Sequence, residues 1–174
     1  RGLAADWACP QLPASPREAI ELAMDIARRQ LDGAGSPRAL TVIGSSLGGF
    51  YATWLAEQLG CKAVLLNPAV EAARDLATQV GEHRMYHSDA PFMFLPEYVA
   101  ELSALHVSRI SQPERYFLVA ATGDEVLDWR EMRDRYAGCR QRIVQGSDHG
   151  LSDFADWMPE VLAFALGATP TDPR

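Results

Sequence analysis

Short apolar segments alternate with longer amphipathic segments along most of the chain. The apolar segments have the length typical of buried strands, and they cover residues 39–43, 63–66, 116–121 and 142–145, with a shorter one at Trp7–Cys9. Apolar positions at helical spacing predict helices over residues 50–59, 128–136 and 154–166. This alternation predicts the α/β class, with βαβ units around a mostly parallel sheet that is flanked by helices.

The N-terminal part of the chain predicts a further amphipathic helix. Ser15 is placed to cap it, Pro16 occupies the first helical position, and Glu18 completes a capping box. Gly33 and Gly35 are expected to end this helix.

Residues 71–110 interrupt the regular alternation. They are predicted to contain a short helix, a loop rich in proline, histidine and aromatic residues, and a second helix over 96–105. We interpret this segment as a lid-like insertion within a single domain that covers residues 1–174. Its aromatic side chains are expected either to form an apolar lid over a binding pocket or to fill the core. They are Tyr86, Phe92, Phe94 and Tyr98.

A G-x-S-x-G motif, from Gly44 to Gly48, lies directly between a predicted strand and a predicted helix. In a nucleophile elbow the serine sits on a sharp, strained turn that projects its hydroxyl above the sheet. The flanking residues then approach neighbouring backbone, where glycine avoids a clash. Ser46 is therefore the candidate nucleophile, while the Ser45 side chain is expected to point elsewhere. The alternative is a glycine-rich turn without chemistry.

Four histidines are candidates for the base that a serine nucleophile needs. His149 lies in a loop between the last predicted strand and the last predicted helix. The base falls there in the order nucleophile, acid, base. The other three precede the predicted acid and are expected to be surface or hydrogen-bonded polar residues. They are His83, His87 and His106.

The carboxylate that would orient the histidine is expected directly after the strand predicted at 116–121. Asp124 follows the glycine at the end of that strand, and this position favours it over the adjacent Glu125. Asp128 is expected to cap the next helix instead. Asp148 precedes the candidate base in the sequence, and adjacent loop residues usually point apart.

Backbone N–H groups are needed to stabilise the oxyanion that forms during acyl transfer. The first is expected from Leu47, the residue after the nucleophile. A second normally comes from the loop after an earlier strand, often with a His-Gly motif, and no such strand precedes Gly44 in this chain. We therefore expect this N-terminal strand to be missing from the chain, which begins at Arg1.

The charge balance restricts the partners. The chain has 16 basic and 23 acidic residues, a net charge of −7 and a pI near 5.0. This argues against nucleic acid and against an anionic membrane surface as partners. The arginines between Arg130 and Arg142 alternate with Glu131 and Asp134, so a solvated helix face is expected there.

The cysteines favour a reduced compartment. Cys9, Cys61 and Cys139 are odd in number, lie far apart and show no metal-ligand spacing. No apolar segment is long enough to span a membrane, and no signal peptide is visible. We predict a cytoplasmic protein without a metal or a cofactor.

Six segments form a combination more specific than the G-x-S-x-G motif alone. They are Pro10–Pro13, Gly44–Leu55, Leu66–Ala69, Gly123–Asp128, Tyr136–Arg140 and the loop around His149. Together they resemble the YqiA-like esterases, which are small single-domain α/β-hydrolases; the resemblance is loose over residues 72–115. It implies a cytosolic bacterial esterase acting on acyl esters or thioesters, with a triad at Ser46, Asp124 and His149. In that family a first strand ending in His-Gly-Phe supplies the second oxyanion donor.

The predicted function is hydrolysis of small-molecule acyl esters through an acyl-enzyme. An acyl-CoA thioesterase or an acyltransferase of the same fold is one alternative, because the fold does not choose the acceptor. A hydrolase-like binding protein without catalysis is the other.

Overall fold

The computed structural model of the protein describes residues 7–84 and 91–167. They fall into two compact units. We call the unit within residues 36–70 and 107–174 the sheet unit, and the unit within residues 1–35 and 71–106 the helical unit. The predicted insertion thus groups largely with the N-terminal helix.

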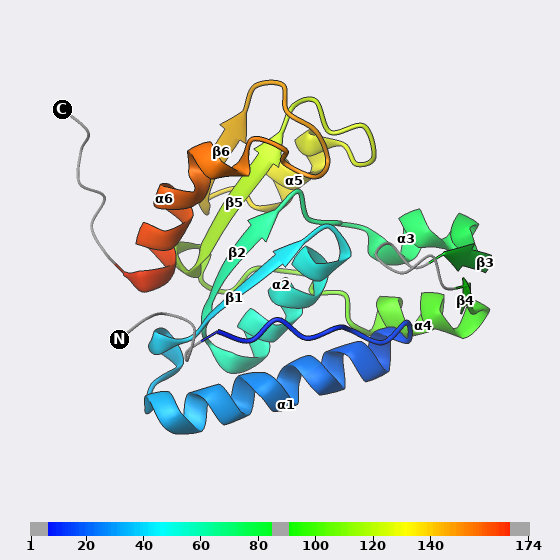
Figure 1. Cartoon of the computed structure of the whole chain (residues 1–174), viewed down its shortest axis with the longest axis horizontal. Coiled ribbons are helices and arrows are strands. Elements are labelled where there is room, and N and C mark those ends of the chain that lie inside the picture. Colours follow the sequence, from blue (N-terminus) through cyan, green and yellow to red (C-terminus); the bar gives the residue numbers. More distant parts are fainter. Residues whose placement is uncertain (1–6, 85–90, 168–174) are drawn as a thin grey trace. The chain divides into compact units, whose positions relative to one another are not determined.

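The sheet unit contains a four-stranded parallel sheet with the strand order β1-β2-β5-β6 (Figure 1). Its strands are β1 (Thr41–Ser45), β2 (Lys62–Leu66), β5 (Tyr116–Ala121) and β6 (Arg140–Val144). Each of the four long predicted strands is present, with β1 starting two residues later than predicted. The reason is a 3-10 helix at Pro37–Ala39, capped by the Ser36 side chain, which takes up Ala39 and has Leu40 as its C-cap. A second 3-10 helix, Pro113–Arg115, precedes β5.

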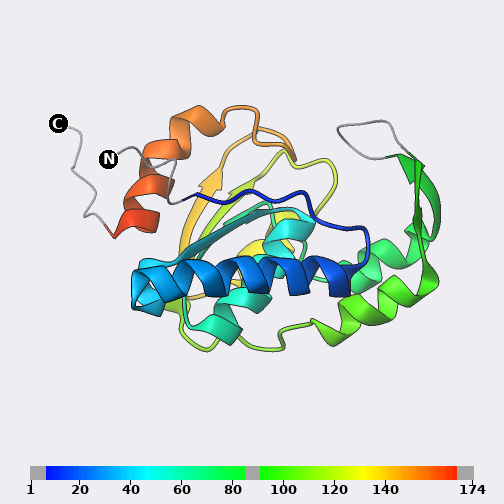
Figure 2. The ribbon, with the colours of Figure 1, turned by 60° about the horizontal axis from the view of Figure 1, so that its bottom comes forward.

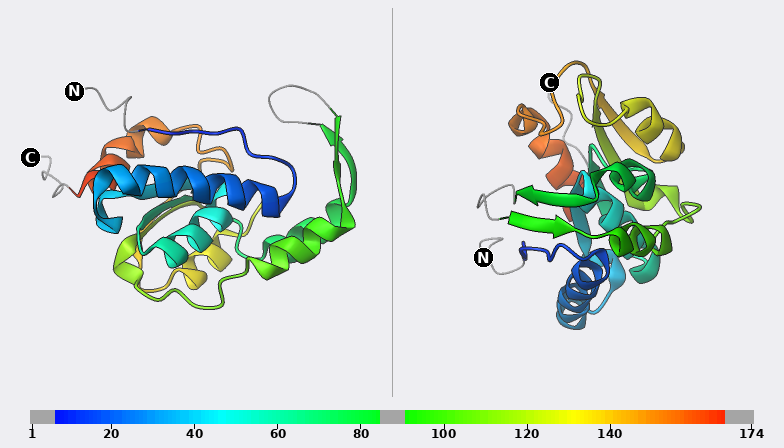
Figure 3. Two further views of the ribbon diagram at one scale, coloured as in Figure 1. Left: turned by 90° about the horizontal axis from the view of Figure 1, so that it is seen from below. Right: turned by 90° about the vertical axis from the view of Figure 1, so that its right-hand side faces the viewer.

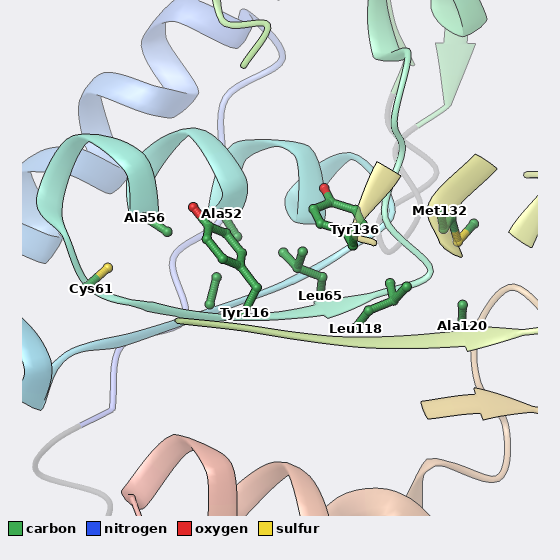
Figure 4. Close-up of a cluster of buried hydrophobic side chains, with 10 residues drawn as sticks. Ala52, Ala56, Cys61, Leu65, Tyr116, Leu118, Ala120, Met132 and Tyr136 are labelled. Carbon is green, nitrogen blue, oxygen red and sulfur yellow. The ribbon is translucent and has the colours of Figure 1, made fainter. Parts of the chain in front are cut away.

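Three helices pack on the two faces of this sheet. They are α2 (Leu47–Leu59), α5 (Trp129–Arg135) and α6 (Phe154–Leu166). Helices α2 and α5 cover one face, and α6 covers the other (Figures 1 and 4). Within residues 7–84 and 91–167, no helix has both the length and the apolar content to cross a membrane.

Strand β5 is buried on both faces, as expected for a central strand of a parallel sheet. Tyr116, Leu118 and Ala120 point toward α2 and α5, where they pack in the cluster shown in Figure 4. Phe117, Val119 and Ala121 alternate with them and pack on the side of α6. Burial of each large apolar side chain contributes about 1.5–3 kcal/mol, so packing on both faces holds β5 firmly within the sheet.

The helical unit consists of helices and one two-stranded antiparallel sheet (Figures 2 and 3). Its elements are α1 (Pro16–Ala34), α3 (Ala72–Leu76), a 3-10 helix (Ala77–Gln79), β3 (Gly81–Arg84), β4 (Pro91–Phe94) and α4 (Pro96–Ala104). The strands β3 and β4 lie where a loop was predicted. The helix predicted at 96–105 is confirmed as α4.

Helix α1 begins as predicted, because the Ser15 hydroxyl accepts a hydrogen bond from the backbone N–H of Glu18. It ends at Gly35, whose φ of 71° is readily adopted by glycine. The Ser15 hydroxyl also donates to the Glu101 carboxylate at 2.8 Å, which ties the start of α1 to α4.

The strand predicted at Trp7–Cys9 is wrong: these residues have no strand partner, and Pro10 and Pro13 lack the N–H groups that a ladder would need. Tyr86 and His87, named above as an aromatic and a histidine of the insertion, lie outside the described residues.

Candidate active site

Ser46 lies at the junction between β1 and α2, where its backbone adopts φ 52° and ψ −122°. This conformation is strained for a residue other than glycine, and such strain is typical of functional turns. Ser46 directly follows the carboxyl end of β1 and directly precedes the first residue of α2. The strand–turn–helix context that a nucleophile elbow requires is therefore present around the motif.

The glycines of the turn differ in how closely they are packed. A Cβ on Gly44 would collide with the carbonyl oxygen of Gly48, and a Cβ on Gly49 would lie 2.5 Å from the Cβ of Pro68. A Cβ on Gly48 would meet no atom within 4 Å. Crowding by neighbouring atoms thus requires glycine at position 44, the first glycine of the motif, as predicted. The second crowded position is Gly49, which follows the motif, and not Gly48.

The backbone of Ser46 is held by the segment that follows β2. Its N–H donates to the carbonyl of Leu66 at 3.0 Å, and its carbonyl accepts from the N–H of Ala69 at 3.0 Å. Ser46 is consequently fixed from both sides, while its side chain is neither fully buried nor fully exposed.

Asp124 and His149 are in direct contact. Nδ1 of His149 lies 3.0 Å from one carboxylate oxygen of Asp124 and 2.9 Å from the other. The Asp124 side chain is fully buried, whereas 21% of the His149 side chain is exposed. The carboxylate also accepts the N–H groups of Val126 and Leu127, at 2.8 and 2.9 Å. This arrangement orients the imidazole and leaves Nε2 as the ring nitrogen available for proton transfer.

The loops that carry these two residues are hydrogen-bonded to each other. The N–H of Gly123 donates to the carbonyl of Gly146 at 2.9 Å, and the N–H of Thr122 donates to Val144 at 2.8 Å. A Cβ on Gly123 would collide with the carbonyl oxygen of Ser147. The glycine next to Asp124 therefore allows the acid loop to approach the histidine loop closely.

The other carboxylates near the histidine have different partners. Glu125 accepts the backbone N–H of His149 at 3.0 Å, whereas the ring of His149 is hydrogen-bonded to Asp124. Asp128 caps α5 through the N–H of Arg130, as predicted. Asp148 accepts hydrogen bonds from Ser152, and these bonds hold the pKa of the Asp148 carboxyl below its usual value.

Asn67 is a residue of the site whose role the sequence did not indicate. It is fully buried, it follows β2 directly, and its φ is 40°. Its side-chain oxygen accepts the N–H of Ala121, and its side-chain nitrogen donates to the carbonyls of Asp148 and His149. The one sequence signal was an amide residue between an apolar strand and a proline.

Ser46 and the histidine–aspartate pair belong to the same sheet unit. Within the part of that unit that the structure describes, the Ser46 hydroxyl makes no hydrogen bond to the His149 ring. In enzymes without substrate this bond is often long and tightens on binding. The two residues are connected instead through residues 66–69. Leu66 and Ala69 are hydrogen-bonded to the backbone of Ser46, and the Asn67 side chain is hydrogen-bonded to the carbonyl of His149.

The described residues contain no group of three or more histidine, cysteine, aspartate or glutamate side chains that would hold a metal ion.

Two of the other histidines considered for the base lie outside the sheet unit. The ring of His83 contacts that of Phe92 within the helical unit. His106 is the last residue of the same unit, so both histidines belong to the helical unit, whereas Ser46, Asp124 and His149 belong to the sheet unit.

Solved structures of other proteins share this fold. A protein from Agrobacterium vitis S4 is 18% identical, with a TM-score of 0.65 over 87% of this chain and 69% of its own. The esterase domain of a Rhodothermus marinus protein is 23% identical, with a TM-score of 0.60 over 83% of this chain and 68% of its own. The monoacylglycerol lipase of Paleococcus ferrophilus is 15% identical, with a TM-score of 0.58 over 86% of this chain and 76% of its own.

These likenesses confirm the predicted α/β-hydrolase fold. The sequence itself places the chain more narrowly, because residues 4–166 match the profile of the uncharacterised protein family UPF0227. The chain therefore belongs to this family, the YqiA-like esterase family that its motifs resemble.

Proposed function

We propose that the protein is a serine hydrolase that cleaves small-molecule acyl esters, with Ser46 as nucleophile, His149 as general base and Asp124 as the orienting carboxylate. The contact of His149 Nδ1 with both oxygens of the buried Asp124 carries this proposal. The family and the esterase and lipase named among the proteins of similar fold support it.

The reaction proceeds in two acyl-transfer steps. Ser46 Oγ attacks the ester carbonyl carbon while Nε2 of His149 takes the hydroxyl proton, and Asp124 stabilises the charged imidazole. Collapse of the tetrahedral intermediate breaks the ester bond, and His149 gives the proton to the leaving alcohol. A water molecule then attacks the acyl-enzyme by the same route, which releases the carboxylic acid and restores Ser46.

The N-terminus of α2 provides one donor for the oxyanion. Leu47 is the first residue of this helix, so its N–H has no carbonyl partner one turn earlier in the helix. The helix dipole also favours negative charge at this end. We assign the Leu47 N–H as the donor that faces the oxyanion in the transition state, a role typically worth about 2.7–4 kcal/mol.

Labelling with a fluorophosphonate probe tests the proposal directly. We expect covalent labelling of the wild-type protein, and its loss in Ser46→Ala. Ser45→Ala is the matched control, since Ser45 is an exposed neighbour in the same turn and should label normally. Absence of labelling in the wild type, or labelling that survives Ser46→Ala, would refute the proposal.

A substrate panel tests the bond that is cleaved. We expect turnover of p-nitrophenyl esters at a higher kcat/KM than turnover of acyl-CoA thioesters. The opposite order would make the protein a thioesterase and would leave the roles of Ser46, His149 and Asp124 unchanged.

A further inference from the structure

Asn67 is a polar side chain that joins the loop carrying His149 to the carboxyl end of β5. Its side chain is fully buried and makes three hydrogen bonds, all to backbone groups. The acceptor oxygen binds Ala121 N–H at 2.8 Å, at the last residue of β5. The amide nitrogen donates to the carbonyl of Asp148 at 3.0 Å and to that of His149 at 2.9 Å.

The same chain segment also holds the nucleophile. Residue 66, directly before Asn67, accepts the N–H of Ser46, and residue 69 donates to the carbonyl of Ser46. Pro68 lies between them and packs against the turn at Gly49, where a Cβ would come within 2.5 Å of its own Cβ. The spacing between Ser46 and the His149 backbone is therefore set by residues 66–69.

The chemistry of the amide suits this role better than that of any other side chain of its size. Both protons on the amide nitrogen are used by two carbonyls, and the amide oxygen is used by one N–H. A carboxylate in this place would direct a negative oxygen at two carbonyl oxygens. Asparagine also tolerates the positive φ of 40° seen here better than most residues do.

We infer that Asn67 is a positioning residue for the proposed hydrolase: it fixes the backbone of the general base His149 relative to the nucleophile Ser46. This inference rests on the proposed function. It assigns Asn67 no contact with substrate, so its loss should slow the chemical step without weakening substrate binding.

The test compares Asn67→Ala with Tyr116→Phe in steady-state hydrolysis of a p-nitrophenyl ester. Tyr116→Phe removes a hydrogen bond to Glu57 at the opposite end of the same sheet, so it destabilises the fold without touching the catalytic loops. For Asn67→Ala we expect kcat to fall about 10–100-fold, with KM changed less than about twofold. For Tyr116→Phe we expect a lower Tm and an unchanged kcat.

The rate constant for fluorophosphonate labelling should fall in parallel with kcat in Asn67→Ala, because it reports the reactivity of folded molecules. If Asn67→Ala does not fold, Asn67→Ser is measured in its place, since a hydroxyl has one donor hydrogen and cannot replace both amide donations to the carbonyls of Asp148 and His149. An unchanged kcat in a folded Asn67 variant would overturn the inference, and so would an equal loss of kcat in Tyr116→Phe. Either result would leave the proposed function standing, whereas labelling that survives Ser46→Ala would remove the proposed function itself.

Discussion

Both carboxylate oxygens of Asp124 lie at hydrogen-bond distance from Nδ1 of His149, although the two residues are 25 positions apart in the chain. Asp124 comes from the loop after β5 and His149 from the loop after β6, and these strands are neighbours in the sheet. Parallel strands end at the same edge, so their loops meet there. The contact is therefore a direct consequence of the strand order.

Replacing Asp124 by asparagine should reduce catalysis far more than it reduces stability. The asparagine would keep the shape of the side chain but would no longer stabilise the charged imidazole in the required tautomer, a change that typically lowers kcat by about 10⁴-fold. The measurement is kcat for a p-nitrophenyl ester, with Glu125→Gln as control because the glutamine amide oxygen can still accept the backbone N–H of His149. A loss of kcat in Glu125→Gln as large as that in Asp124→Asn would contradict the assignment.

Of two glycines in the same motif, Gly44 should lose stability on replacement by alanine and Gly48 should not. Gly44→Ala places a Cβ against the carbonyl of Gly48. We expect this overpacking to cost about 1–3 kcal/mol and to lower the Tm by several degrees or more. Gly48→Ala has open space around the new Cβ and replaces a glycine inside α2, so its Tm should be equal or slightly higher. Thermal unfolding followed by circular dichroism decides between these outcomes, and equal losses in both variants would disprove the steric argument.

The local pattern of apolar and polar residues was sufficient to predict the regular strands and helices of the sheet unit. The bounds of β5 and α6 agree with the prediction residue by residue, because each has a clear apolar pattern bounded by polar residues or glycine. Strand β6 begins two residues earlier than predicted, since Arg140 and Gln141 at this sheet edge interrupt the apolar pattern. The strands β3 and β4 were missed because four residues each, with His83 and Arg84 among them, give too short a pattern to recognise.

The parts of the site that depend on contacts between residues far apart in the sequence could not be predicted from local patterns. The order of Ser46, Asp124 and His149 along the chain was enough to choose candidates, and their catalytic roles remain proposals. The role of Asn67 depends on groups 54, 81 and 82 positions away, which no local spacing reveals. The cytoplasmic location remains a prediction, because the fold does not depend on it.

The three thiols should differ sharply in reactivity. Cys61 is fully buried, and burial raises the pKa of its thiol to about 11. Burial likewise raises the pKa of Cys139 to about 11, whereas Cys9 is exposed. Since the thiolate is the reactive form, we expect one thiol per chain to react rapidly with Ellman's reagent at neutral pH, and the other two only in denaturant. In Cys9→Ser the rapid phase should be absent; a rapid phase that persists would show that Cys61 or Cys139 reacts in the folded protein.

Glu57 stabilises the far end of the sheet unit through a cluster of hydrogen bonds. Its carboxylate accepts the phenol O–H of Tyr116 and the backbone N–H of Ser111 at 3.2 Å, and it lies 3.5 Å from the Arg115 guanidinium. Partial burial acts to raise the pKa of Glu57, but the hydrogen bonds and the positive charge outweigh it and hold the pKa below the ordinary 4.5.

This lowered pKa predicts a specific dependence of stability on pH. Because the native carboxyl binds its proton less readily than the unfolded one, its contribution is fully present above about pH 4.5 and is lost as the pH falls through the native pKa. Glu57→Gln cannot titrate at this position, so its Tm should be lower than that of the wild type at neutral pH, and the difference should shrink on acidification below pH 4.5. Thermal unfolding of both proteins across this range measures it. A Tm difference that stays constant from neutral to acidic pH would mean that the charge of Glu57 contributes nothing to stability and that only its packing and hydrogen-bond geometry matter.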